Sequence, residues 1–204
     1  MSRIVLTCLI GAIVMAVFLR GAGARSFTID AAQSRATVEV GKSGVFSFAG
    51  HTHEVEARAV TGTVTVDMDD PVRSTVQVDI DASALKVTGK GESADDVPKV
   101  QETMSSAQVL DVQKYPKITF ASTSVAVKSR TGAALETNVT GQLTIRNVAR
   151  TISVPVHVRL DGQTLTASGR FSVKQTEYSI KPVTVGGVVS VKDAVDITFT
   201  IVGR

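Results

Sequence analysis

Residues 152–171 read ISVPVHVRLDGQTLTASGRF, and this stretch decides the fold class of the chain. From Ile152 to Leu160 every second residue is aliphatic, and the residues between them are Ser, Pro, His and Arg. The pair Asp161-Gly162 then favours a tight hairpin turn before a second alternating run that ends at Val173. Successive side chains on a strand point to opposite faces, so each run has one apolar face and one polar face. Such runs are typical of antiparallel strands, and Pro155 predicts an edge, a bulge or a bend inside the first run.

The same two-residue period continues over most of the chain from Ser26 onward. It is clearest in residues 76–82, 118–121, 142–146, 152–160, 166–173 and 195–201. Further strands are predicted at 34–41, 51–57, 60–67, 85–88 and 123–128, with turns at 69–71, 131–132, 161–162 and 186–187. The sequence therefore predicts an all-β domain of eight or more antiparallel strands. These strands can stack as two sheets or close into a barrel, and the period alone does not choose between them.

One segment departs from this period and predicts a short helix at about 97–106. Asp95 and Asp96 are suited to a helix start, and Pro98 falls in the first turn, where proline is tolerated. Val97, Val100 and Met104 recur at helical spacing and give the segment one apolar side.

Residues 1–24 have the three-part layout of a secretory signal peptide. Arg3 precedes an apolar run from Ile4 to Leu19, and Ala22-Gly23-Ala24 supplies a cleavage site before Arg25. A retained membrane anchor is the alternative, but the run is shorter than the roughly 20 residues that span a bilayer. We therefore expect a mature single domain of residues 25–204, without a stable membrane anchor, in the periplasm or secreted.

Composition excludes several classes of protein. Of the 204 residues 43% are hydrophobic and 20% charged, which is typical of a globular chain. The net charge of +3 is scattered and forms no basic stripe, so we expect no nucleic-acid partner. The single cysteine, Cys8, lies in the signal segment, so the mature chain has no disulfide. The common nucleotide-binding and zinc-protease motifs are absent from the sequence.

Several strings, taken in order along the chain, resemble the YceI-like family of exported proteins, and GHTHEV suggests a side branch of it. They are FTID at 27–30 with Ser34, GHTHEV at 50–55, Met104 with VLD at 109–111, YPKITFAS at 115–122, GQLTI at 141–145, and the ending from Gly186-Gly187 to Phe199. The most specific part is YPKITFAS together with its spacing to GQLTI. The chain departs from many members at Gln33, where they carry His, and at 91–96, where they carry an Arg-Asp-x-His-Leu string.

This resemblance implies a lipocalin-like antiparallel β-barrel of about eight strands with one short helix at its side. It also implies a binding protein rather than an enzyme, without a cofactor, whose elongated lumen holds a polyisoprenoid or a fatty-acyl compound. The candidate lumen residues are Val76, Val78, Ile80, Ile118, Phe120, Leu143, Ile145, Val154, Val156, Phe171 and Phe199. Composition alone favours a solid core of the same residues, because protein interiors are close-packed. Candidates to hold a polar head group are Lys42, Lys86, Lys90 and Arg58.

Two further functions remain open from the sequence. His51 and His53 lie two residues apart on one strand face, a spacing that two ligands of one metal ion can have. They are weak candidates, because a zinc site usually has three or four protein ligands, and we expect no metal. The third possibility is an interaction module with a solid core, whose partner-binding surface would be the loops 43–50, 89–96 and 183–190.

Overall fold

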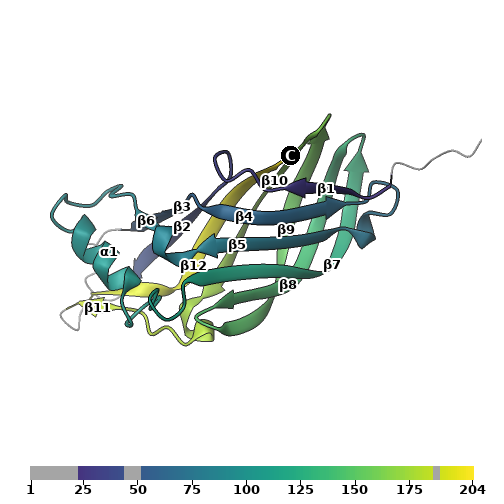
Figure 1. The fold of residues 1–204 in the computed structure, drawn as a ribbon. Coiled ribbons are helices and arrows are strands. Elements are labelled where there is room, and N and C mark those ends of the chain that lie inside the picture. Colours follow the sequence, from purple (N-terminus) through teal and green to yellow (C-terminus); the bar gives the residue numbers. More distant parts are fainter. Residues whose placement is uncertain (1–22, 44–51, 186–188) are drawn as a thin grey trace, which may run out of the picture.

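The alternating runs form antiparallel strands, as the sequence predicts (Figure 1). In this computed structural model residues 23–43, 52–185 and 189–204 are described, so the predicted signal segment lies almost wholly outside them. The strands are β1 (Arg25–Thr28), β2 (Arg35–Ser43), β3 (His53–Ala57), β4 (Val60–Val66), β5 (Thr75–Asp81), β6 (Lys86–Val87), β7 (Lys117–Thr131), β8 (Ala134–Ile145), β9 (Val148–Asp161), β10 (Thr164–Lys174), β11 (Thr184–Val185) and β12 (Val189–Gly203). Short 3-10 helices are η2 (Pro71–Arg73), η3 (Ala82–Ala84) and η4 (Gln175–Tyr178).

Eight of these strands close into a ring, which confirms the predicted barrel. Their order is β1-β4-β5-β7-β8-β9-β10-β12, and each neighbouring pair is antiparallel. The seam lies between β1 and β12, where the backbones of Thr28 and Arg204 exchange two hydrogen bonds of 2.8 and 2.9 Å. The amide of Asp30 adds a third bond by donating to the carbonyl of Val202.

The strand count exceeds eight because three of the long strands are broken and because the short strand β11 pairs with β12. Each broken strand consists of two strands that follow each other closely in the chain with a bend between them. The three pairs are β1 with β2, β3 with β4, and β5 with β6. β2 pairs with β12 where β1 no longer does, and β3 and β6 extend the sheet beyond β2. At that end of the barrel β6 is the last strand of the sheet, and the helix α1 (Val97–Ser105) packs beside it. The predicted helix at 97–106 is thereby confirmed.

The runs 118–121 and 123–128, predicted as separate strands, belong to the single strand β7. The register shifts between Ser122 and Ser124, so that Thr123 is an extra residue with no partner on β8. Before this bulge the even-numbered residues Ile118 and Phe120 point inward, and after it the odd-numbered Val125 does. The alternation is interrupted while the strand continues.

The predicted turns and the prediction for Pro155 are confirmed where the structure describes them. Asp161 pairs with Thr164 across a two-residue turn in which Gly162 has a φ of 57°, a conformation that glycine adopts readily. The turn predicted at 186–187 lies outside the described residues. The ladder between β9 and β10 runs from Asp161 back to Val156 and stops there, so that Pro155 has no partner on β10 and lies at a local edge of β9.

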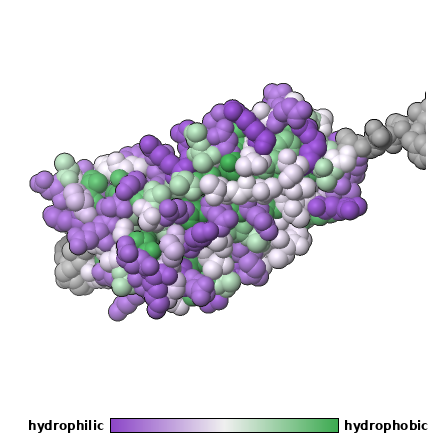
Figure 2. All heavy atoms as spheres, viewed as in Figure 1, coloured by the Kyte–Doolittle hydropathy of each residue, from purple (hydrophilic) through white to green (hydrophobic). Residues whose placement is uncertain are grey.

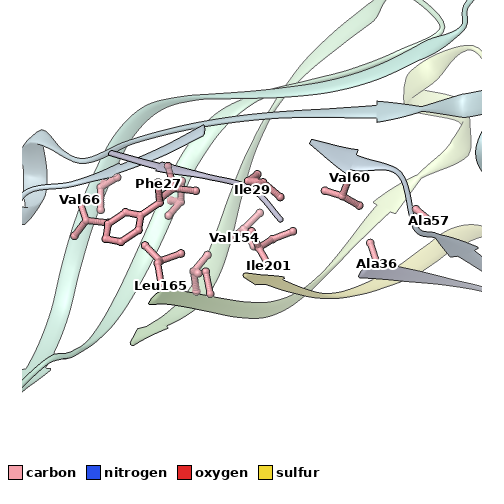
Figure 3. Close-up of a cluster of buried hydrophobic side chains, with 14 of the residues drawn as sticks. Phe27, Ile29, Ala36, Ala57, Val60, Val66, Val154, Leu165 and Ile201 are labelled. Carbon is pink, nitrogen blue, oxygen red and sulfur yellow. The ribbon is translucent and has the colours of Figure 1, made fainter. Parts of the chain in front are cut away.

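The half of the barrel at the seam is solid. Side chains from neighbouring and nearby strands pack together there, with Phe27 and Val66 facing Leu165, and Ile29 facing Ile201 (Figure 3). Leu165 is fully buried, and Phe27 is 2% exposed. Figure 2 shows that much of the outer wall carries residues of intermediate hydropathy, while hydrophobic patches lie among hydrophilic residues toward the end with α1. None of the helices in the described part of the chain is long and apolar enough to cross a membrane.

Candidate functional site

The half of the barrel toward α1 contains a cavity of about 760 Å³. This volume lies within the range of roughly 300–1,000 Å³ that is usual for small-molecule sites. Most of its wall is aliphatic: Ala36, Val38, Val40, Val55, Ala57, Ile80, Leu85, Val100, Met104, Val109, Leu110, Ile118, Leu143, Ile145, Val173, Ile180, Val183, Val191, Val195 and Ile197. The inward faces of the strands therefore fill one half of the barrel and line a hollow in the other.

Three phenylalanines lie between the solid half and the cavity. The rings of Phe171 and Phe199 meet edge to face with their centroids 6.3 Å apart, and Phe171 lines the cavity. The Phe199 ring lies against the backbone of Gly169, where a Cβ atom, if glycine had one, would come within 2.8 Å of it. Phe120 covers Gly141 in the same way, with a corresponding distance of 2.5 Å. Both glycines thus provide the space that lets a large ring lie flat on the barrel wall.

Helix α1 forms one side of the cavity and is attached to β6 by a side-chain amide. Gln101 accepts a hydrogen bond from the Val87 amide at 2.9 Å and donates one to the Leu85 carbonyl at 3.0 Å. These two bonds satisfy backbone groups on the outer edge of β6 in the way that another strand would. Val100 and Met104, on the inner side of the helix, line the cavity.

The short helix η4 places Tyr178 in a second part of the cavity wall. Tyr178 is fully buried, and its hydroxyl has no hydrogen-bond partner among the described residues. It packs with Leu143, Val173 and Val195. Burial, and to a smaller extent the charge of Glu177, raise the pKa of Tyr178 to about 12, and the charge of Arg150 opposes the shift.

Polar side chains gather at the α1 end of the cavity. They are Lys42 from the end of β2, His53 from the start of β3, Glu92 and Asp96 from the loop before α1, and Lys99 and Thr103 from α1. The side chain of Glu92 is 1% exposed, and its Oε1 pairs with Nδ1 of His53 at 3.0 Å. Its other oxygen, Oε2, is buried without a partner among the described residues. Asp96 pairs with Lys99 at 3.0 Å and accepts a hydrogen bond from Ser93.

Of the eleven lumen residues predicted from the sequence, the structure brings five to the cavity wall. These are Ile80, Ile118, Leu143, Ile145 and Phe171. Val154 and Val156 are buried in the solid half, and Val76, Val78, Phe120 and Phe199 pack against that core. Contact of any of them with a ligand remains a prediction.

The predicted head-group cations lie in different places. Lys42 lines the cavity, whereas Lys90 pairs with Glu54 at 2.8 Å and Arg58 pairs with Glu56 at 2.8 Å. Hydrogen bonds from Lys90 and Thr88 lower the pKa of Glu54, and the hydrogen bond to Glu54 raises the pKa of Lys90. Lys86 is exposed on β6.

Of the two candidate metal ligands, His51 lies outside the described residues, and His53 contacts Glu92. Within the described ranges, no three His, Cys, Asp or Glu side chains gather in a way that could hold a metal ion.

Sequence reasoning missed several cavity residues. Val38 and Val40 follow the same alternation as the predicted residues and could have been found from it. Glu92 and Tyr178 carry no periodic signal, because the first lies in a loop and the second in a 3-10 turn. Their burial depends on the loops that fold over the end of the barrel.

Comparison with known proteins matches the chain to one family over nearly its whole length. A profile of the YceI-like domain matches residues 27–203. A search of curated proteins finds no match.

Solved structures with the same architecture include BcnA of Burkholderia cenocepacia. It is 24% identical, with a TM-score of 0.67, over 86% of this chain and 99% of BcnA. A polyisoprenoid binding domain from Saccharophagus degradans, implicated in plant cell wall breakdown, is 14% identical, with a TM-score of 0.62, over 87% of this chain and 97% of that domain. The YceI protein of Campylobacter jejuni is 13% identical, with a TM-score of 0.56, over 74% of this chain and 84% of that protein. At these identities the likeness shows the fold.

Proposed function

The chain belongs to the YceI-like domain family, and from this premise we propose that it is an exported protein that binds an apolar ligand in its cavity without transforming it. The ligand class is an isoprenoid-like or fatty-acyl compound. The observation that carries this proposal is the cavity of about 760 Å³ with a largely aliphatic wall. Burial of each methylene group of a ligand in such a wall contributes about 0.8 kcal/mol. The similarity in fold to a polyisoprenoid binding domain supports the same class of ligand.

A carrier fits this cavity better than an enzyme does. The hydrocarbon wall offers no hydrogen bonds to an alkyl chain, so selection would rest on the length and width of the cavity. Hydrolysis would require a nucleophile held next to a base, and the hydrogen-bond partner of His53, the one histidine in the described cavity wall, is the Glu92 carboxylate and not a hydroxyl or thiol.

Export is the second part of the proposal, and it rests on the signal layout of residues 1–24. The first strand begins at Arg25, immediately after the expected cleavage site. Expression of the full chain in a bacterial host should yield a mature protein whose first residue is Arg25, measured by mass spectrometry of the periplasmic fraction. Ala24→Phe should block cleavage, because signal peptidase requires a small residue there. A wild-type chain that keeps residues 1–24 in the cytoplasm would contradict export.

Filling the cavity should abolish binding of an apolar ligand. Val38 points into the cavity, while its neighbour Thr37 lies on the opposite face of β2. We expect Val38→Phe to weaken the binding of the fluorescent probe N-phenyl-1-naphthylamine by at least about ten-fold, because the ring would occupy ligand space. Thr37→Phe is the matched control and should bind like the wild type.

Solvent extraction of the purified protein, followed by mass spectrometry, tests the ligand class directly. We expect an apolar compound from the wild type and less of it from Val38→Phe, with equal melting temperatures for the two proteins. Failure to recover any apolar compound, together with equal probe binding by both variants, would refute the carrier function and favour an interaction module.

A further inference from the structure

The cavity contains one buried carboxylate with an unused hydrogen-bonding position. The side chain of Glu92 is 1% exposed, and His53 occupies its Oε1 at 3.0 Å. Its Oε2 is buried and has no partner among the described residues. An unsatisfied buried polar atom is unfavourable, so few remain in folded proteins, and each needs an explanation.

The surroundings of Glu92 indicate which chemical group would satisfy that oxygen. Glu92 and His53 both line the cavity, at the end where the wall changes from aliphatic to polar. The two cations at this end already have interactions of their own: Lys99 pairs with Asp96 at 3.0 Å, and Lys42 also has a partner. A carboxylate accepts hydrogen bonds, and it repels phosphate and carboxylate groups. The complementary ligand end is therefore a hydrogen-bond donor without negative charge.

We propose that Glu92, held in place by His53, is the head-group subsite of the cavity and accepts a hydrogen bond from the terminal hydroxyl of an apolar alcohol. The alkyl or prenyl chain then lies along the aliphatic wall toward Phe171. This inference rests on the proposed function and adds a preference to it. The protein should bind an alcohol more tightly than an ether or an anion that has the same hydrocarbon chain. The chain carries Glu92 within the segment 91–96, where its sequence departs from the string that many family members carry.

Displacement of N-phenyl-1-naphthylamine by three compounds with the same chain tests the subsite. The compounds are farnesol, farnesyl methyl ether and farnesyl phosphate. Farnesol ends in a hydrogen-bond donor, the ether ends in a hydrogen-bond acceptor without a proton to donate, and the phosphate ends in an anion. We expect the wild type to bind farnesol about ten-fold more tightly than the ether, as one hydrogen bond to a charged group predicts, and to bind the phosphate weakest.

Glu92→Gln preserves the shape of the side chain but turns the unpaired end into an N–H donor when the amide oxygen faces His53. This variant should lose the preference for farnesol over the ether and bind the phosphate more tightly than the wild type does. Glu136→Gln is the matched control, because Glu136 pairs with His157 at 2.6 Å on the exposed side of β8 and β9. It should retain the wild-type preference.

The outcomes separate this inference from the carrier function. Equal affinity of the wild type for farnesol and its ether would overturn the head-group subsite and leave the carrier function intact. That comparison needs no variant, so it holds even if Glu92→Gln does not fold. Failure of all three compounds to displace the probe would overturn both proposals.

Discussion

At Tyr178 the chain buries a phenol whose hydroxyl has no partner within the described residues, and this single residue makes stability depend on pH. Its pKa is about 12 in the folded protein, above the ordinary value of 10.0. At a pH between these two pKa values, the phenol has lost its proton in the unfolded chain but keeps it in the folded protein. The stability that Tyr178 contributes is therefore complete below pH 10 and is lost as the pH rises toward 12.

Tyr178→Phe should remove this dependence, because phenylalanine has no proton to lose. Between pH 8 and pH 11 we expect the wild type to lose about 1 kcal/mol more unfolding free energy than the variant, measured by urea denaturation. At pH 8 the variant should be as stable as the wild type or slightly more stable, since it no longer buries an unsatisfied hydroxyl. Equal losses in the two proteins would show that this phenol is not desolvated.

At the scale of elements, α1 is attached to the sheet by two hydrogen bonds of one side chain and by its apolar side. Gln101 bonds both Val87 and Leu85, while its neighbour Glu102 is exposed on the other side of the helix. None of its residues is fully buried, although Val97, Val100 and Met104 pack against the hydrophobic core. A short helix that has no fully buried residue can open locally while the barrel stays folded.

Gln101→Ala should loosen α1 and leave the barrel intact. We expect faster amide hydrogen exchange throughout residues 97–105, with protection in β8 and β9 unchanged, and faster dissociation of N-phenyl-1-naphthylamine. Glu102→Ala serves as the control and should behave like the wild type. Exchange that speeds up in every strand would indicate global destabilisation and contradict a local role of Gln101.

The elements themselves were largely predictable from the sequence, because alternation depends on neighbouring residues alone. The bulge at Thr123 was not predictable in this way, because it interrupts the alternation without ending the strand. The turn between β8 and β9 was missed as well: Arg146 and Asn147 both have positive φ there, and arginine is not a residue that marks such turns. The position of Glu92 in the candidate site depends on how the loop before α1 folds, which periodicity does not encode.

At the scale of the whole molecule, the barrel divides into a solid half and a hollow half. The sequence assigned the inward positions of many strands correctly but could not divide them between the two halves. That division depends on which residues pack together inside the barrel, such as Phe27 with Leu165 in the solid half. The sequence of one strand does not show how large the side chains are that pack against it from other strands.

This division predicts unequal costs for similar truncations. Leu165 is fully buried in the solid half, and Leu165→Ala should cost about 2–5 kcal/mol of unfolding free energy. Ile197 borders the cavity, so its side chain already lacks partners on one side. Ile197→Ala should cost roughly 1–2 kcal/mol, because it enlarges an existing space instead of creating a new one. Urea denaturation of both variants checks this, and equal costs would contradict a hollow half.

The seam between β1 and β12 has a consequence for how the chain is made. Val202 donates its amide proton to the hydroxyl of Ser34 across 168 residues of sequence, and Thr28 bonds Arg204 beside it. The ring therefore cannot close until the ribosome has finished almost the whole of this sequence. Pairings of such long range form slowly, which keeps a nascent polypeptide unfolded for longer. An open, threadable chain is the form that a secretion channel can accept.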